Sequence, residues 1–211
     1  MMDSPGPAPA KTDEALWQQL KEGSEQALGK LINRYFNVLQ NYGCKFVRDE
    51  AFVKDCVQEV FIELWRRRER LSIPNRVRAY LLGSVRKRVL REGYRQKLIG
   101  SEEPEHQDLE NNGQLVEFSP EWQTIEQESL TETTQRLSTA LAKIPKRQRE
   151  AIYLRYYQNL ERDEIAEIMD VNPQSVSNLL QAAYVSLRDK FPLLLLLAKS
   201  WQLISFSDKW R

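Results

Sequence analysis

The sequence predicts an all-α protein in which an acidic, flexible linker joins two small helical domains. Apolar residues recur at steps of three and four over most of the chain, as they do along one side of a helix. Helix-favouring Leu, Gln, Glu, Arg and Ala dominate, and the chain has only 8 Gly. The periodicity fades over residues 98–128, which therefore form the linker, and 211 residues leave room for two small domains.

The first domain is predicted over residues 13–97. Its first two helices lie between residues 14 and 42, because the pair Gly23-Ser24 interrupts the pattern. The third helix follows one apolar stripe, so its opposite face is left for polar residues. The stripe consists of Val53, Cys56, Val57, Val60, Phe61, Leu64 and Trp65.

A loop at Pro74 and Asn75 precedes the fourth helix, which starts near Val77. We expect its basic side to be exposed, because charged side chains rarely enter a core unless they are paired. This side holds Arg78, Arg86, Lys87, Arg88 and Arg91.

The second domain is predicted over residues 129–191. A helix that begins near residue 130 ends at Pro145, and this proline is expected to be the first residue of the next helix. A short helix over residues 161–169 and a turn then lead to another helix that begins at Pro173. This order is typical of a DNA-reading helix-turn-helix, and an ordinary pair of packed helices is the alternative.

Three residues support the helix-turn-helix interpretation, and a fourth, Asp170, departs from the usual pattern. Ala166 and Val176 supply a small and an apolar residue where the two helices would cross. Asn172 is placed to cap the second helix. Asp170 stands in the turn at a position where a positive φ usually favours Gly.

Both ends of the chain lie outside these domains. Residues 1–12 are polar and proline-rich, so we predict a disordered tail without a signal peptide. Residues 192–211 form a hydrophobic extension, and the apolar run 191–198 is far shorter than the ~20 residues of a membrane-spanning helix. We expect a cytoplasmic protein with no membrane contact.

The small net charge of +1 hides a strong separation of charge. Residues 66–97 hold twelve Lys and Arg against two acidic residues, whereas residues 101–135 hold ten acidic residues and no Lys or Arg. Such asymmetry indicates a polyanion-binding surface beside an acidic segment. A solvated helix face is the alternative, although concentrated like charge is unfavourable without a partner.

The second helix of the helix-turn-helix carries no charged side chain over residues 173–187. Phosphate contacts by Lys and Arg supply most non-specific affinity for DNA, so this helix predicts a weak grip. Its polar residues can still read base edges: Gln174, Ser175, Ser177, Asn178 and Gln181. Basic side chains for phosphate contacts would have to come from the preceding helices. These residues are Lys143, Lys146, Arg147, Arg149 and Arg155.

The sequence offers no catalytic or metal-binding constellation. Cys44, Cys56 and His106 are too few and too scattered for a metal site, and Cys56 fits a buried, reduced thiol. There is no Gly-rich phosphate loop and no nucleophile–base pair. We therefore expect no catalytic residues, no metal and no cofactor, and a protein that is not an enzyme.

Three segments resemble one family, the extracytoplasmic-function (ECF) RNA polymerase sigma factors of the sigma-70 superfamily. Residues 55–65 read DCVQEVFIELW and resemble the family's polymerase-binding helix, D-x-x-Q-E-V-F-x-x-L-W. Residues 78–87 read RAYLLGSVRK and are similar to the helix that recognises and melts the −10 element. Residues 144–156, with the helix-turn-helix after them, resemble the −35-reading region 4.

The resemblance implies a sigma factor that binds core RNA polymerase and directs promoter recognition, DNA melting and transcription initiation. Residues 13–97 would be region 2 and residues 129–191 region 4. Core polymerase would bind Asp55, Gln58, Glu59 and Ile62. The −10 element would bind Arg76, Arg78, Tyr80, Arg86, Lys87, Arg88 and Arg91. The −35 element would bind the five polar residues of the uncharged helix.

This chain departs from the family pattern at two places. The family usually has Asn where Lys87 stands, and basic residues near Ser177, Leu179, Ala182 and Tyr184. Promoter targeting would then rely on the −10 module, on polymerase or on an extra recruiting partner, and an anti-sigma factor is a further expected partner. The alternative is a helix-turn-helix transcription regulator that is not a polymerase subunit, which would not co-purify with core polymerase.

Overall fold

The computed structural model describes residues 12–99, 141 and 143–188, and every regular element in these ranges is helical. The chain divides into two compact units, Met1–Gln107 and Asp108–Arg211. Four predicted segments lie almost wholly outside the described residues: the N-terminal tail, the linker after its first two residues, the helix that begins near residue 130, and the C-terminal extension. None of the described helices is both long and apolar enough to cross a membrane.

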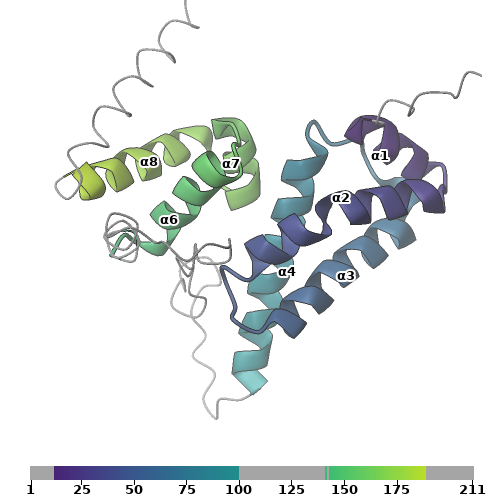
Figure 1. Ribbon diagram of the computed structural model, residues 1–211, viewed down its shortest axis with the longest axis horizontal. Coiled ribbons are helices and arrows are strands. Elements are labelled where there is room, and N and C mark those ends of the chain that lie inside the picture. The colour runs from purple at the N-terminus through teal and green to yellow at the C-terminus, as the bar shows by residue number, and fades with distance from the viewer. Residues whose placement is uncertain (1–11, 100–140, 142, 189–211) are drawn as a thin grey trace, which may run out of the picture. The chain divides into compact units, whose positions relative to one another are not determined.

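The first unit is a bundle of four helices (Figure 1). They are α1 (Asp13–Lys21), α2 (Glu25–Gly43), α3 (Glu50–Arg67) and α4 (Val77–Ile99), with the short 3₁₀ turn η1 (Arg68–Arg70) after α3. Thr12, Ser24 and Asp49 cap the first three helices, because each side chain accepts a backbone N–H three residues later. The predicted break at Gly23-Ser24 is confirmed, and Gly23 adopts φ 89° between α1 and α2.

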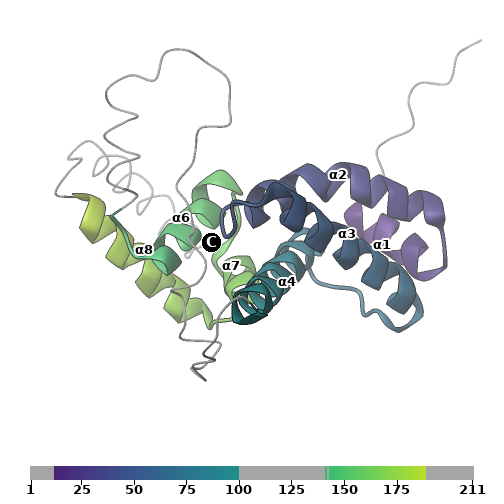
Figure 2. The same ribbon diagram turned by 90° about the horizontal axis from the view of Figure 1, so that it is seen from below.

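The core of this unit lies where α2, α3 and α4 pack side by side, as Figure 1 and Figure 2 show. The predicted stripe of α3 is buried except at Trp65, which is half-buried. Trp17 on α1 is fully buried, and its Nε1 donates to the Ser72 carbonyl at 3.0 Å. Its ring meets the Tyr80 ring edge-on, with centroids 5.2 Å apart, so α1 is fixed both to the loop before α4 and to α4 itself.

α2 makes a close contact with its neighbours at Gly43, its last residue. A Cβ atom at Gly43 would lie 2.5 Å from Val53 Cγ1 on α3, and 3.6 Å from Val85 Cγ1 and Val89 Cγ2 on α4. A side chain at this position would overlap Val53, so only glycine lets the end of α2 approach α3 this closely.

The second unit contains α6 (Lys146–Ile152), a π-helical turn η2 (Tyr153–Tyr157), α7 (Arg162–Met169) and α8 (Pro173–Arg188). Leu141, Ile144 and Ile152 pack with Ala183 and Leu187 of α8. Pro145 is the N-cap of α6 and not its first helical residue, so that prediction was wrong by one position. The π-helical turn was not predicted.

The helix-turn-helix geometry is confirmed at each predicted residue. Asp170 adopts the left-handed conformation, with φ 56° and ψ 52°. Asn172 Oδ1 accepts the Ser175 backbone N–H at 2.7 Å, and Pro173 is the first residue of α8. Ala166 and Val176 are both buried where α7 and α8 cross.

We predict that Gly43→Ala lowers the free energy of unfolding by about 1–3 kcal/mol, because the new methyl group overlaps Val53 in a packed core. Gly29→Ala is the matched control on the same helix. It has nothing within 4 Å of its Cβ and is expected to raise stability by about 0.5–1 kcal/mol. Urea denaturation measures both, and equal effects of the two variants would contradict the packing argument.

Candidate protein-docking and nucleic-acid interfaces

The outer face of α3 brings together the four residues predicted to bind a protein partner. Asp55, Gln58, Glu59 and Ile62 are all exposed, because the stripe of α3 that starts at Val53 turns toward the core. Ile62 is an apolar side chain with 41% of its surface exposed among polar neighbours. An exposed aliphatic residue framed by hydrogen-bonding groups suits the centre of a protein-protein contact.

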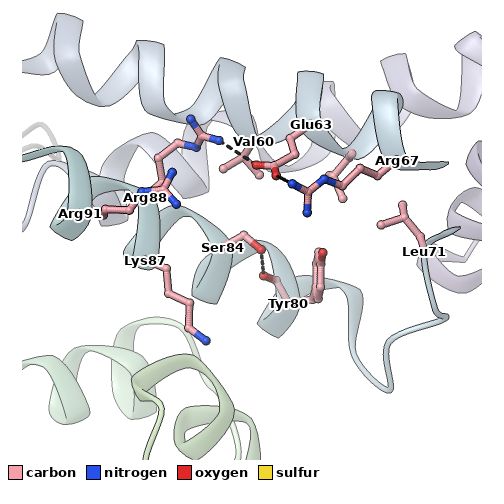
Figure 3. A pocket seen from close by; sticks show the side chains of 10 residues that line it. Val60, Glu63, Arg67, Leu71, Tyr80, Ser84, Lys87, Arg88 and Arg91 are labelled. Carbon is pink, nitrogen blue, oxygen red and sulfur yellow. Dashed lines mark hydrogen bonds and ion pairs between the residues drawn. The ribbon is translucent and has the colours of Figure 1, made fainter. Parts of the chain in front are cut away.

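Ion pairs join α3 to α4 beside this face (Figure 3). Arg88 on α4 contacts Glu63 at 2.8 Å and Glu59 at 3.9 Å, and Arg67 contacts Glu63 at 2.7 Å. The Arg88 side chain is only 16% exposed. Arg88 therefore contributes to the joint between the helices. The sequence predicted it on an open basic surface, and that prediction was wrong.

A shallow pocket of about 190 Å³ lies between α3 and α4 at this joint (Figure 3). Four cationic side chains and the Glu63 carboxylate line it, together with the ring of Tyr80. The hydroxyl of Ser84 also lines it and donates to the Tyr80 carbonyl at 2.8 Å. Positive charge beside an aromatic ring suits phosphate contact and base stacking. The four cations are Arg67, Lys87, Arg88 and Arg91.

The residues predicted to bind the −10 element differ in exposure. Arg76, Lys87 and Arg91 are exposed, and Arg78 and Tyr80 are half-buried. Arg86, predicted to be exposed, is buried, with 8% of its surface accessible. The reason is helical phase: Arg86 follows the buried Leu82 by four residues and precedes the buried Val89 by three, so all three lie on the core side.

The polar residues predicted to read DNA share the outer side of α8. Gln174, Asn178 and Gln181 are exposed, and Ser175 and Ser177 are half-buried. The Gln174 amide donates to Asn178 Oδ1 at 3.1 Å, which leaves both side chains with further donor and acceptor capacity for base edges.

The sequence predicted that Arg155 supports DNA binding by the uncharged helix. In the structure it instead binds the loop before α7. Its guanidinium donates to the Leu160 carbonyl at 2.7 Å and pairs with Glu161 at 3.0 Å. Its side chain is 14% exposed. Arg155 thus holds the chain between η2 and α7 and has little surface to offer a nucleic acid.

No role was predicted from the sequence for the tyrosines that lie next to α8. Tyr156 and Tyr157 are about half exposed on η2, and the Tyr157 ring stacks on Tyr153 with centroids 5.0 Å apart. The Tyr156 hydroxyl forms a hydrogen bond with the hydroxyl of Tyr184 on α8. The aromatic run at 153–157 was the available signal, but the contact spans 28 residues of sequence.

The cysteines have the environment of inert thiols. Cys56 is buried on α3, and this burial raises the pKa of its thiol to about 11. Burial also raises the pKa of the half-buried Cys44. Neither is a ready thiolate at neutral pH, so the chemistry of a reactive cysteine is absent at these two positions. The described residues contain no cluster of His, Cys, Asp and Glu that could hold a metal ion.

Two family models match the chain. Residues 31–97 match sigma-70 region 2 and residues 134–187 match sigma-70 region 4. Together the matches cover more than half of the 211 residues. They fall on the two units in the order that the sequence predicted.

The chain is also similar to curated and solved proteins. It is 26% identical to the ECF RNA polymerase sigma-E factor of Escherichia coli K12 over 163 residues, which are 75% of this chain and 83% of the relative. The sigma-E factor of Shigella flexneri matches with the same values.

Two solved structures share the fold. One is CnrH in complex with the cytosolic domain of CnrY, with a TM-score of 0.53 at 19% identity, over 87% of this chain and 96% of that chain. The other is the sigma factor RpoE in complex with the anti-sigma factor NepR from Bartonella quintana. Its TM-score is 0.51 at 15% identity, over 78% of this chain and 96% of that chain.

We predict that Arg86→Ala lowers the free energy of unfolding by about 1–3 kcal/mol, because its buried stem packs in the core and would leave a cavity. Lys87→Ala, on the exposed side of the same turn, is expected to stay within about 0.5 kcal/mol of the wild type. Thermal melts of both variants test the assignment. If Arg86→Ala melts at the same temperature as the wild type, Arg86 does not pack in the core and belongs to the exposed surface.

Proposed function

Because this chain belongs to the sigma-70 family of RNA polymerase sigma factors, in its ECF group, we propose that it binds core polymerase through the outer face of α3. Its partners are RNA polymerase and promoter DNA, and sigma factors in general are not enzymes. We assign residues 13–97 to region 2, 98–128 to a linker and 129–191 to region 4.

The exposed position of Ile62 carries the docking proposal. Burial of an aliphatic side chain against a partner contributes roughly 1.5–3 kcal/mol, and surrounding polar groups fix the orientation. Gln58 and Asp55 can exchange hydrogen bonds with the partner at the rim. Glu59 adds a negative charge next to Arg88, so a basic surface on polymerase would fit this face.

Promoter melting is the proposed task of α4. Extrusion of a base from the duplex costs a few kcal/mol, which stacking and cationic contacts to the released strand can offset. The pocket beside Tyr80 offers both, with the exposed cations Lys87 and Arg91 at its rim. Arg76 and Arg78 add two further cations at the start of α4, whereas the buried Arg86 supports the helix from inside.

Reading of the −35 element is the proposed task of α8. Side-chain amides such as Gln174 and Asn178 pair well with adenine, which has one donor and one acceptor on its major-groove edge. Since residues 173–187 add no cation, region 2 and polymerase would carry most of the binding energy.

A protein that holds this sigma factor inactive is a further proposed partner. The solved relatives CnrH and RpoE are each described in complex with another protein, CnrY and the anti-sigma factor NepR. A recruiting protein would act in the opposite direction and deliver the chain to its promoter. Co-purification with core polymerase separates all of these roles from that of a helix-turn-helix regulator outside polymerase.

We predict that Gln58→Ala combined with Ile62→Asp weakens binding to purified core polymerase by about ten- to a hundredfold, because it removes a central contact and buries a charge. Both residues are exposed, so helical content measured by circular dichroism should not change. Asn37→Ala on the exposed side of α2 is the control and should bind as the wild type does. Equal affinities of the double variant and the wild type would remove α3 from the interface.

We predict that Lys87→Ala combined with Arg91→Ala flattens the salt dependence of promoter binding by the holoenzyme. The log–log slope should fall by about one unit for each lost phosphate contact. Lys30→Ala removes an exposed cation of α2 and should leave the slope unchanged. If the double variant has the same salt-dependence slope as the wild type and the Lys30→Ala control, the cations of α4 do not contact phosphates and form a solvated surface.

A further inference from the structure

The hydroxyls of Tyr156 and Tyr184 form a pair at the edge of the uncharged helix α8. Their rings meet edge-on, with centroids 6.3 Å apart and an interplanar angle of 75°. Tyr156 has 52% of its surface exposed. An aromatic pair whose polar ends meet near solvent is suited to a polar partner, since a purely structural pair would bury this surface.

The register of α8 places this pair on the same side of the helix as the proposed base-reading residues. Tyr184 follows Gln181 by three residues and Ser177 by seven, and such spacings repeat along one side of a helix. In a helix-turn-helix the first turns of the second helix meet the base edges. A side chain two turns later on the same side therefore lies toward the rim of the groove, where the phosphates are.

The chemistry of the pair is that of neutral hydrogen-bond donors. Burial and the hydrogen bond with Tyr156 raise the pKa of the Tyr184 hydroxyl, so it stays protonated at physiological pH. One O–H group makes the hydrogen bond between the two tyrosines, and the pair carries two. Phosphate oxygens only accept hydrogen bonds, and a bond from a neutral group to a charged one is stronger than a neutral pair.

We propose that the Tyr156–Tyr184 pair binds the phosphate backbone of promoter DNA beside α8, next to the base-reading residues. These neutral donors take the place of the lysines and arginines that α8 lacks. The inference rests on the proposed function, because it requires that α8 faces DNA. Its consequence is distinctive: neutral donors release no counterions, so this contact adds affinity without adding to the salt dependence.

The test uses the full-length protein in complex with core polymerase and a DNA duplex that the wild-type holoenzyme selects from a random-sequence library. Affinity is measured from about 50 to 200 mM KCl. Tyr156→Phe combined with Tyr184→Phe should weaken binding about tenfold, because a hydrogen bond to a charged group is lost, and the salt slope should not change. Tyr157→Phe is the control: its ring stacks on Tyr153, outside the pair, and it should bind as the wild type does.

Ser177→Arg is the reciprocal variant on the same side of α8. It should strengthen binding and steepen the log–log slope by about 0.9, as one added cationic phosphate contact does. A double tyrosine variant with wild-type affinity for the duplex overturns the inference, and so does one whose salt slope falls or whose affinity for core polymerase alone is lost. If the wild-type chain forms no holoenzyme or selects no duplex, the proposed function fails together with this inference.

Discussion

The pairing of Arg88 on α4 with Glu63 on α3 is the interaction on which the proposed sites of the first unit depend, because it joins the helix proposed to dock polymerase to the helix proposed to meet DNA. The guanidinium is largely covered, so the loss of Glu63 would leave a poorly solvated cation and cost more than the pair itself contributes. Arg67 satisfies the second oxygen of Glu63, which makes the joint a small network.

This joint limits which cations are available to a nucleic acid. Of the charges on α4, Arg86 supports the core and Arg88 holds α3, whereas Lys87 and Arg91 line the pocket from exposed positions. The dense positive charge of the sequence is therefore not one uniform surface. Different faces of the same helix stabilise the fold and offer cations to the proposed nucleic-acid ligand, as the 3.6-residue period allows.

Structural features that depend on residues close in sequence could be predicted from the sequence, whereas contacts between residues far apart in sequence could not. The turn at Asp170 and the cap at Asn172 were readable because each acts within three residues of its own position. Trp17 and Ser72 meet across 55 residues, and no periodicity encodes that contact. Arg86 is a different case: its spacing from Leu82 and Val89 was visible, but its charge was given more weight than its phase.

An uncharged reading helix is consistent with a subunit that never searches for DNA by itself. Under the proposed function, region 2 and polymerase would hold the promoter first, and region 4 would then meet its element at an effective concentration that a tether can raise to the millimolar range. A weak contact then suffices, and stronger phosphate binding would mainly increase attachment to unrelated DNA. Under this constraint neutral donors such as the Tyr156–Tyr184 pair would favour correct placement over affinity, because hydrogen bonds depend on geometry more steeply than charge attraction does.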